Sequence, residues 1–170
     1  MKRIVLSPLP VKLDKSALME KNHIDPESDL AEEFSDLVDA AENVLRCKAI
    51  LVEAEPGMVP VPAASAPKYF YAMTVGREID EDEDCDYPYL GDVVRQAALD
   101  EAMAVTIDYL KTECGMVSPV FLNPGSEGGW EQTANVALVQ LTGAEELGIT
   151  VDDRGYMTPW YSTVGMFTEA

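Results

Sequence analysis

Two short segments carry the residues best suited to binding a ligand. The first, residues 123–130, reads NPGSEGGW and joins an expected strand to an expected helix. Its glycines let backbone N–H groups approach a ligand closely. The second, residues 155–165, reads GYMTPWYSTVG and gathers two tyrosines, a methionine and a tryptophan. Both segments also suit packing, the first as a helix entry with Trp130 in the core, so the ligand and core interpretations stay open.

The side chains that common hydrolases need are missing from the sequence. His23 is the only histidine, so a serine triad and a histidine-based zinc site lack their usual parts. Ser126 lies in PGSEG, where a nucleophile elbow has glycine in place of Pro124. The glycine patterns of dinucleotide and P-loop phosphate sites do not occur. The carboxylates Glu127 and Asp153, both in expected loops, leave a small-molecule enzyme with a carboxylate base as a further alternative.

The cysteines and the acidic run at residues 78–86 predict neither a disulfide framework nor a metal site. Cys47, Cys85 and Cys114 are odd in number and include no C-x-x-C pair. Alternating aspartates in the acidic run resemble the first ligands of an EF-hand loop. However, Cys85 stands where that loop needs glycine, and Gly91 stands where it needs a bidentate glutamate. We therefore interpret residues 78–86 as a solvated turn, and Cys47 as a buried structural residue.

The charge of the chain excludes several classes of partner. Its 170 residues include 12 Lys and Arg against 31 Asp and Glu, which gives a net charge of −19. Nucleic acids and anionic membranes are bound mainly by clustered Lys and Arg, so we expect no nucleic-acid partner and no membrane partner. No stretch reaches the roughly 18 apolar residues of a membrane-spanning helix, and prolines interrupt the first apolar run. These features predict a soluble, cytoplasmic protein.

Four helices are expected from capping residues and apolar spacing. Asp14 is a candidate N-cap for a helix over residues 15–22. Asp25 and Pro26 form a second helix start, followed by an amphipathic pattern through about Leu45. The longest pattern covers residues 90–114, and its apolar side chains predict a central, buried helix. A fourth helix is expected from Trp130 to about Leu141.

The strand pattern predicts an α+β fold. After a short extended N-terminus, residues 49–55 and 68–76 have strand composition and flank a proline-rich loop at 56–67, which predicts a hairpin with a long tip. Residues 116–124 form another expected strand, and the tail from Gly148 contains two or three short strands. This order is neither regular βαβ alternation nor helix alone. It predicts one domain over residues 1–170, with a mostly antiparallel sheet.

The two candidate segments, 123–130 and 155–165, resemble the activation domain of vitamin B12-dependent methionine synthase, in a compact free-standing form. The shared pattern is a strand ending in Pro-Gly, then Trp and Gln, a helix, G-I-x-[LV], and M-x-P-x-x-S-x-x-G. The matching residues are Pro124, Gly125, Trp130, Gln132, 148–151, Met157, Pro159, Ser162 and Gly165. The order of the earlier helices and of the strand ending in TVG is also similar, so the resemblance covers nearly the whole chain.

The resemblance implies a twisted, mostly antiparallel sheet flanked by helices. It also implies a function: in the full-length enzyme this domain binds S-adenosylmethionine and presents the methyl group to oxidised cobalamin, while a flavoprotein supplies an electron. Cobalamin would come only through a corrinoid-binding methyltransferase partner. The residues that the resemblance places at the S-adenosylmethionine site are Asn123, Pro124, Gly125, Tyr156, Met157, Pro159 and Ser162.

Two departures from the family pattern define the alternatives. The expected arginine position falls on Phe121 and the expected tyrosine position on Ser126, so the carboxylate of S-adenosylmethionine loses its guanidinium partner. One hypothesis is an accessory protein that assists a corrinoid methyltransferase in trans, in which both segments form one concave, partly apolar surface. The other is a non-enzymatic binding or scaffold protein that has lost S-adenosylmethionine binding, with Trp130, Tyr156 and Trp160 in the core. The sequence identifies no catalytic side chain.

Overall fold

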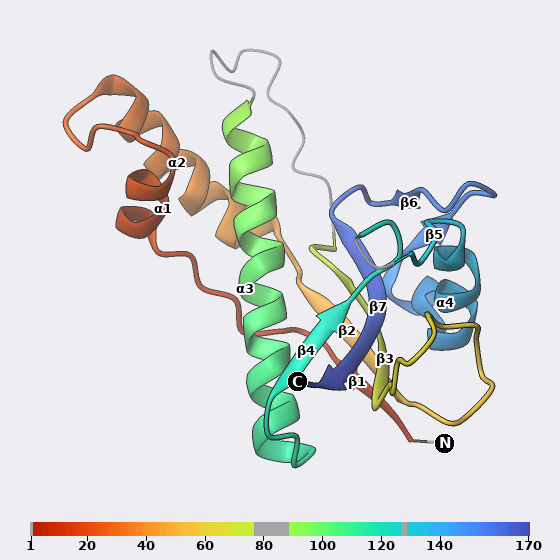
Figure 1. The fold of residues 1–170 in the computed structure, drawn as a ribbon. Coiled ribbons are helices and arrows are strands. Elements are labelled where there is room, and N and C mark those ends of the chain that lie inside the picture. Colours follow the sequence, from red (N-terminus) through yellow and green to blue (C-terminus); the bar gives the residue numbers. More distant parts are fainter. Residues whose placement is uncertain (1, 77–88, 127–128) are drawn as a thin grey trace.

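A five-stranded antiparallel sheet forms the centre of the chain in a computed structural model that describes residues 2–76, 89–126 and 129–170 (Figure 1). Its strand order is β1-β2-β3-β7-β4, and every neighbouring pair is antiparallel. The strands are β1 (Arg3–Leu6), β2 (Lys48–Glu53), β3 (Tyr69–Thr74), β4 (Pro119–Leu122) and β7 (Ser162–Glu169). A separate two-stranded hairpin pairs β5 (Thr150–Val151) with β6 (Met157–Thr158). The predicted α+β class with a mostly antiparallel sheet is confirmed.

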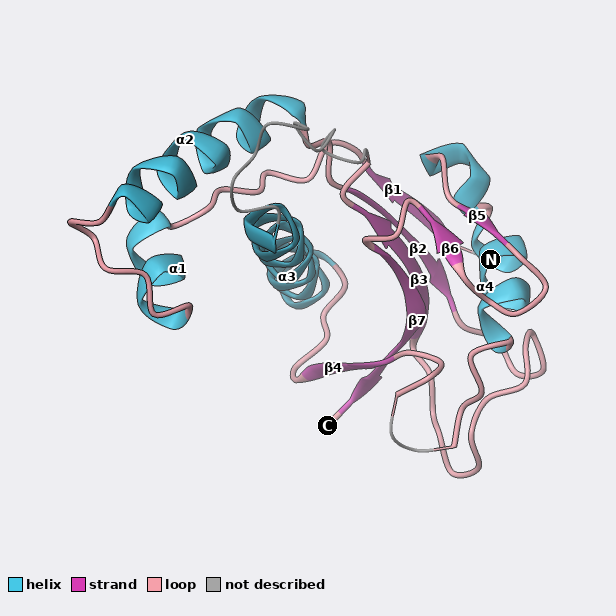
Figure 2. Cartoon of the chain, turned by 90° about the horizontal axis from the view of Figure 1, so that it is seen from above, coloured by secondary structure: helices cyan, strands magenta, loops and turns pink. Residues whose placement is uncertain are grey.

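Helices cover both faces of the sheet. The helices α1 (Lys15–Lys21), α2 (Asp29–Val44) and α3 (Tyr89–Glu113) lie on one side. On the other side lie α4 (Ala134–Thr142), the short 3-10 helix η1 (Ala144–Leu147) and the β5–β6 hairpin (Figure 2). The long helix α3 lies between α2 and the sheet (Figure 2), in the central position that its apolar composition predicts.

Alternation along the strands builds the two cores. In β3, Tyr71 and Met73 face the α2–α3 side, whereas Phe70 and Ala72 face the α4 side, because successive side chains of a strand point to opposite faces. All four side chains are buried. A strand that is buried on both faces reads as a continuous apolar run, which is why YFYAM could be identified as a strand from composition.

The starts of two helices differ from the expected positions. Asp25 does not cap α2. Its carboxylate instead accepts a hydrogen bond from the Glu27 backbone N–H at 3.0 Å, while Ser28 caps the helix by accepting from the Ala31 N–H at 3.2 Å. Trp130 likewise precedes α4, which begins at Ala134. In both places a turn stands before the helix, and Ser28 caps α2 with its side chain whereas Thr133 makes no such bond at the start of α4. A turn and a first helical turn use the same residue types, so the sequence does not separate them.

The largest difference from the sequence-based expectation is β7. The tail contains three strands, within the expected two or three, and β5 and β6 are short as expected. However, β7 has eight residues and pairs with both β3 and β4 inside the sheet. The polar residues Ser162 and Thr163 at its start weaken the apolar pattern. Ser162 is buried nevertheless, because its hydroxyl donates to the Thr74 hydroxyl at 2.8 Å. The acidic run at residues 78–86 lies outside the described residues.

Two buried groups in the core predict a loss of stability at alkaline pH. Burial raises the pKa of the Cys47 thiol to about 11, and raises the pKa of the Tyr71 hydroxyl above its ordinary value. The unfolded chain therefore ionises first as the pH rises, so these two groups should leave the free energy of unfolding unchanged below about pH 9 and lower it above that pH. Urea unfolding from pH 7 to 11 measures this. Tyr71→Phe should make the decline shallower, and an equally steep decline in that variant would contradict the assignment.

Candidate functional site

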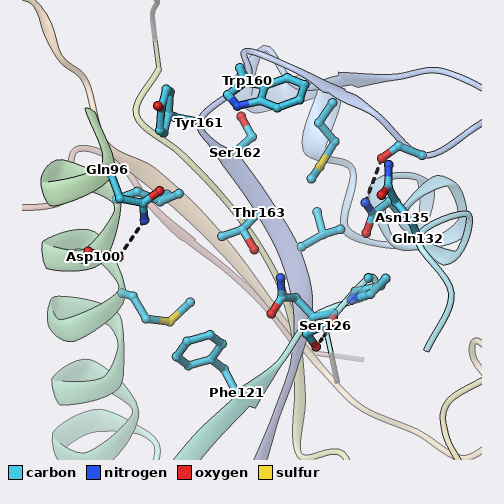
Figure 3. A pocket seen from close by; sticks show the side chains of 18 of the residues that line it. Gln96, Asp100, Phe121, Ser126, Gln132, Asn135, Trp160, Tyr161, Ser162 and Thr163 are labelled. Carbon is cyan, nitrogen blue, oxygen red and sulfur yellow. Dashed lines mark hydrogen bonds between the residues drawn. The ribbon is translucent and has the colours of Figure 1, made fainter. Parts of the chain in front are cut away.

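A cavity of about 860 Å³ opens between α3, the β4 end of the sheet and the β5–β6 hairpin. Gln96 and Asp100 project into it from α3, Ser162 and Thr163 lie behind it on β7, and Gln132 and Asn135 lie on the far side (Figure 3). Pockets of about 300–1,000 Å³ accommodate cofactors and other small ligands. The cavity is thus large enough for a ligand of nucleoside size.

Six of the seven residues that the sequence places at a ligand site line this one cavity. They are Asn123, Pro124, Gly125, Tyr156, Met157 and Ser162. Pro159 is not among the lining residues. Phe121 and Ser126, at the positions where the family pattern departs, also line the cavity. The two segments, 123–130 and 155–165, are separate in the chain, and the fold brings residues of both to the same cavity.

The turn after β4 is held by its own backbone. The Gly125 N–H donates to the Trp130 carbonyl at 2.8 Å, and the Ser126 hydroxyl donates to the Asn123 carbonyl at 2.5 Å. Gly125 has a φ of +85°, a conformation that favours glycine. Trp130 is 6% exposed and packs in the α4-side core. For this residue the core interpretation is therefore confirmed, and Trp130 anchors the turn. The glycine turn itself stays at the cavity wall.

Polar contacts hold the turn of the β5–β6 hairpin together and join it to α4. One Asp152 carboxylate oxygen accepts hydrogen bonds from the Arg154 N–H at 2.9 Å and the Tyr156 N–H at 3.0 Å. The Asn135 side chain donates to the Gly155 carbonyl at 2.8 Å. A Cβ on Gly155 would lie 2.2 Å from the Gln132 carbonyl oxygen, so only glycine permits this approach. These contacts hold Tyr156 at the cavity rim.

Aromatic side chains form much of the cavity rim. Tyr156 and Trp160 are 44% and 65% exposed, and their rings are nearly parallel with centroids 6.2 Å apart. Tyr161 follows them, and its hydroxyl donates to Asp92 at 3.1 Å. Phe121 contributes a further, 48% exposed ring from β4. The aromatic cluster therefore lines a surface instead of completing a core.

The helix wall of the cavity was not identified from the sequence. Asp100 lies on an exposed part of α3, and nothing in the spacing of Gln96, Leu99 and Met103 along the sequence indicates a site. The structure places all four against the β4 turn and the β7 strand, which lie far away along the chain. Local spacing on the helix contains no information about that pairing. Gln96 donates to Asp100 at 2.9 Å and so positions its carboxylate.

The described lining of the cavity carries a negative charge and no positive charge. Among the described lining residues, Asp100 is the one charged side chain, and no lysine or arginine contributes. The groups whose pKa burial displaces, such as Cys47 and Tyr71, do not line the cavity. Within the described residues, no group of three or more His, Cys, Asp and Glu side chains is placed to hold a metal ion. The arrangement suits binding and positioning of a ligand.

Comparisons with protein-family models and with curated proteins give no assignment for this chain. No protein-family model matches it, and no curated protein matches it. In the part of the chain that the structure describes, no helix is both long and apolar enough to cross a membrane.

Proposed function

We propose that this chain is an accessory protein that assists a corrinoid methyltransferase in trans, in the manner of the activation domain of cobalamin-dependent methionine synthase. One observation carries the proposal: Asn123, Pro124, Gly125, Tyr156, Met157 and Ser162, selected from a sequence resemblance, line a single cavity. These residues belong to two separate segments of the chain, and both segments reach the same cavity. The antiparallel sheet flanked by helices also agrees with the fold that the resemblance implies.

The role we propose is positioning. S-adenosylmethionine carries the methyl group, and a partner protein carries the cobalamin that receives it. This chain supplies the cavity that holds the donor and the rim that docks on the partner. Holding reactants in a productive geometry lowers the barrier without a catalytic side chain on the chain itself. The exposed Tyr156 and Trp160 at the rim suit such docking, because exposed aromatic side chains are enriched in protein interfaces.

The cavity is large enough for S-adenosylmethionine, but its described lining has no basic side chain to bind the carboxylate of that molecule. The donor carries a carboxylate, and Phe121 stands where the family pattern has arginine. No described lining residue replaces that guanidinium. We therefore expect the isolated chain to bind the donor weakly, and the partner to complete the site.

The alternative, a scaffold protein that has lost the ligand site, is favoured by one observation and opposed by two. Trp130 is buried in the core, as that alternative predicts. Tyr156 and Trp160 are exposed, and a cavity adjoins Gly125. The scaffold alternative predicts neither of these two features. The accessory role accounts for all three observations.

Binding measurements test the proposal directly. Immobilised protein should retain a purified, cobalamin-loaded methionine synthase that lacks its own activation domain, and S-adenosylmethionine should bind more tightly to the pair than to this chain alone. Substitution of Trp160 by aspartate should weaken the complex, because it places a charge at the docking rim. The control is Asp36→Asn on α2, which leaves the rim unchanged. Absence of binding to both the partner and the donor would refute the accessory role.

A further inference from the structure

The lining of the cavity has a chemical preference of its own. Aromatic rings from three parts of the chain reach it: Phe121 from β4, Tyr156 from the hairpin, and the pair Trp160 and Tyr161 from the segment before β7. The methionine side chains of Met103 and Met157 add polarisable apolar surface. Such a wall attracts ligands that have an apolar surface around a positive charge, because the face of an aromatic ring is electron-rich.

Cations already contact two of these rings within the protein. The Arg154 guanidinium lies 5.2 Å from the Tyr156 ring centroid, and the Arg95 guanidinium lies 5.9 Å from that of Tyr161. Each arginine also has an aspartate close by, Asp152 at 3.9 Å and Asp92 at 3.1 Å. Each arginine thus has a carboxylate partner, and neither arginine is among the residues that line the cavity.

Asp100 gives the cavity its net charge. Its carboxylate accepts a hydrogen bond from Gln96, and no ion pair with a described residue neutralises it. Gln96, Asp100 and Tyr161 also line a neighbouring cavity of about 620 Å³ against α1. Asp100 therefore lies where two cavities meet. The net charge of −19 on the whole chain adds a long-range attraction for cations.

We propose that this cavity binds a compact organic cation of the alkylated ammonium class that carries no carboxylate. Trp160 and its neighbouring rings would contact the alkyl groups around the charge, and Asp100 would supply the opposite charge. A zwitterion with a carboxylate would bind less well, since the described lining offers no basic side chain to receive it. The inference rests on the cavity of the proposed function but requires no cobalamin-bearing partner, so either proposal can fail without the other.

Ligand-observed NMR titration of the full chain with choline tests the inference. The comparison ligand is 3,3-dimethylbutan-1-ol, which has the shape of choline with carbon in place of the charged nitrogen. We expect choline to bind about tenfold more tightly, because cation–π contacts and one carboxylate together supply about 1.4 kcal/mol, which corresponds to that ratio. Trimethylglycine, which adds a carboxylate, should bind more weakly than choline.

Variants identify the groups responsible. Trp160→Leu and Asp100→Asn should each weaken choline binding about fivefold or more, and should leave binding of the neutral isostere nearly unchanged. Asp108→Asn is the matched control, because Asp108 is an exposed aspartate two turns further along α3 and does not line the cavity. Equal binding of choline and its isostere would overturn the inference. No choline binding by protein with a native circular dichroism spectrum, or equal loss in the Asp108 control, would also overturn it.

Discussion

Replacing Gly165 by alanine is expected to destabilise the protein by about 3 kcal/mol, at the upper end of the range for overpacked cores. Gly165 lies in β7, opposite Tyr71 of β3. A Cβ there would lie 2.3 Å from the Leu122 carbonyl oxygen, 2.9 Å from a Tyr71 ring carbon and 3.0 Å from the Asn123 Cα. Two of these three atoms are backbone, so they cannot yield by a change of rotamer.

The consequence reaches the cavity. To accommodate the methyl group, β4 must move away from β7, and the β4 end leads directly into Asn123 and the glycine turn. Urea unfolding measures the loss of stability. Gly91→Ala on α3 is the matched control, because it adds the same methyl group where the nearest atom is a flexible Arg95 nitrogen at 3.4 Å. That variant should be neutral or slightly more stable, since alanine favours a helix. Equal stability of the Gly165 variant and the wild type would contradict the close approach of β4 and β7.

Replacing Phe121 by arginine is expected to increase the affinity for S-adenosylmethionine about tenfold or more. The substitution returns a guanidinium to the position where the family pattern has one, and Phe121 is a half-exposed residue of the cavity wall. A hydrogen bond to a charged group contributes about 1.5–3 kcal/mol, and 1.4 kcal/mol corresponds to a factor of ten in Kd. Calorimetric titration of both proteins with the donor measures the change.

The specificity of this gain can be checked with a second ligand and a neighbouring residue. Decarboxylated S-adenosylmethionine lacks the group that the arginine should bind, so its affinity should not rise. Val120→Arg is the control variant, because Val120 is similarly exposed on β4 and does not line this cavity. Successive strand residues face opposite sides of a sheet, so that arginine would point away from the site. An equal gain in both variants would mean that general charge, and not the Phe121 position, sets the affinity.

The main elements of the fold could be predicted from local pattern, because they are long or strongly apolar. The helix α3 has apolar residues along its whole length, and β2 and β3 are short, mainly apolar runs, and their predicted positions agree with the structure. Boundaries were harder to predict where a turn imitates a helix start, as at Asp25 and Trp130. The length of the interior strand β7 is not evident from the sequence, because the polar residues Ser162 and Thr163 at its start interrupt the apolar pattern. Their burial depends on partners such as Thr74, which lies 88 residues earlier.

The site was predictable only in part, for a related reason. Its two loop segments contain glycines and aromatic residues at unusual density, and these features are visible in the sequence. Its helix wall consists of residues such as Asp100 and Met103, which look like ordinary helix residues until the sheet is placed against them. A site formed by distant segments is a property of the tertiary structure. Sequence pattern can identify the loops but not the face that they oppose.

Rescue of an inactivated partner tests the accessory role most directly. The partner is methionine synthase without its activation domain, loaded with oxidised cobalamin and supplied with S-adenosylmethionine and a reducing flavoprotein. Recovery of methylated cobalamin, followed by its absorbance, should require addition of this chain and should fall when Trp160 at the docking rim is replaced by aspartate. The Asp36→Asn control should rescue as the wild type does. A rate of recovery that is the same with and without this chain would contradict the account.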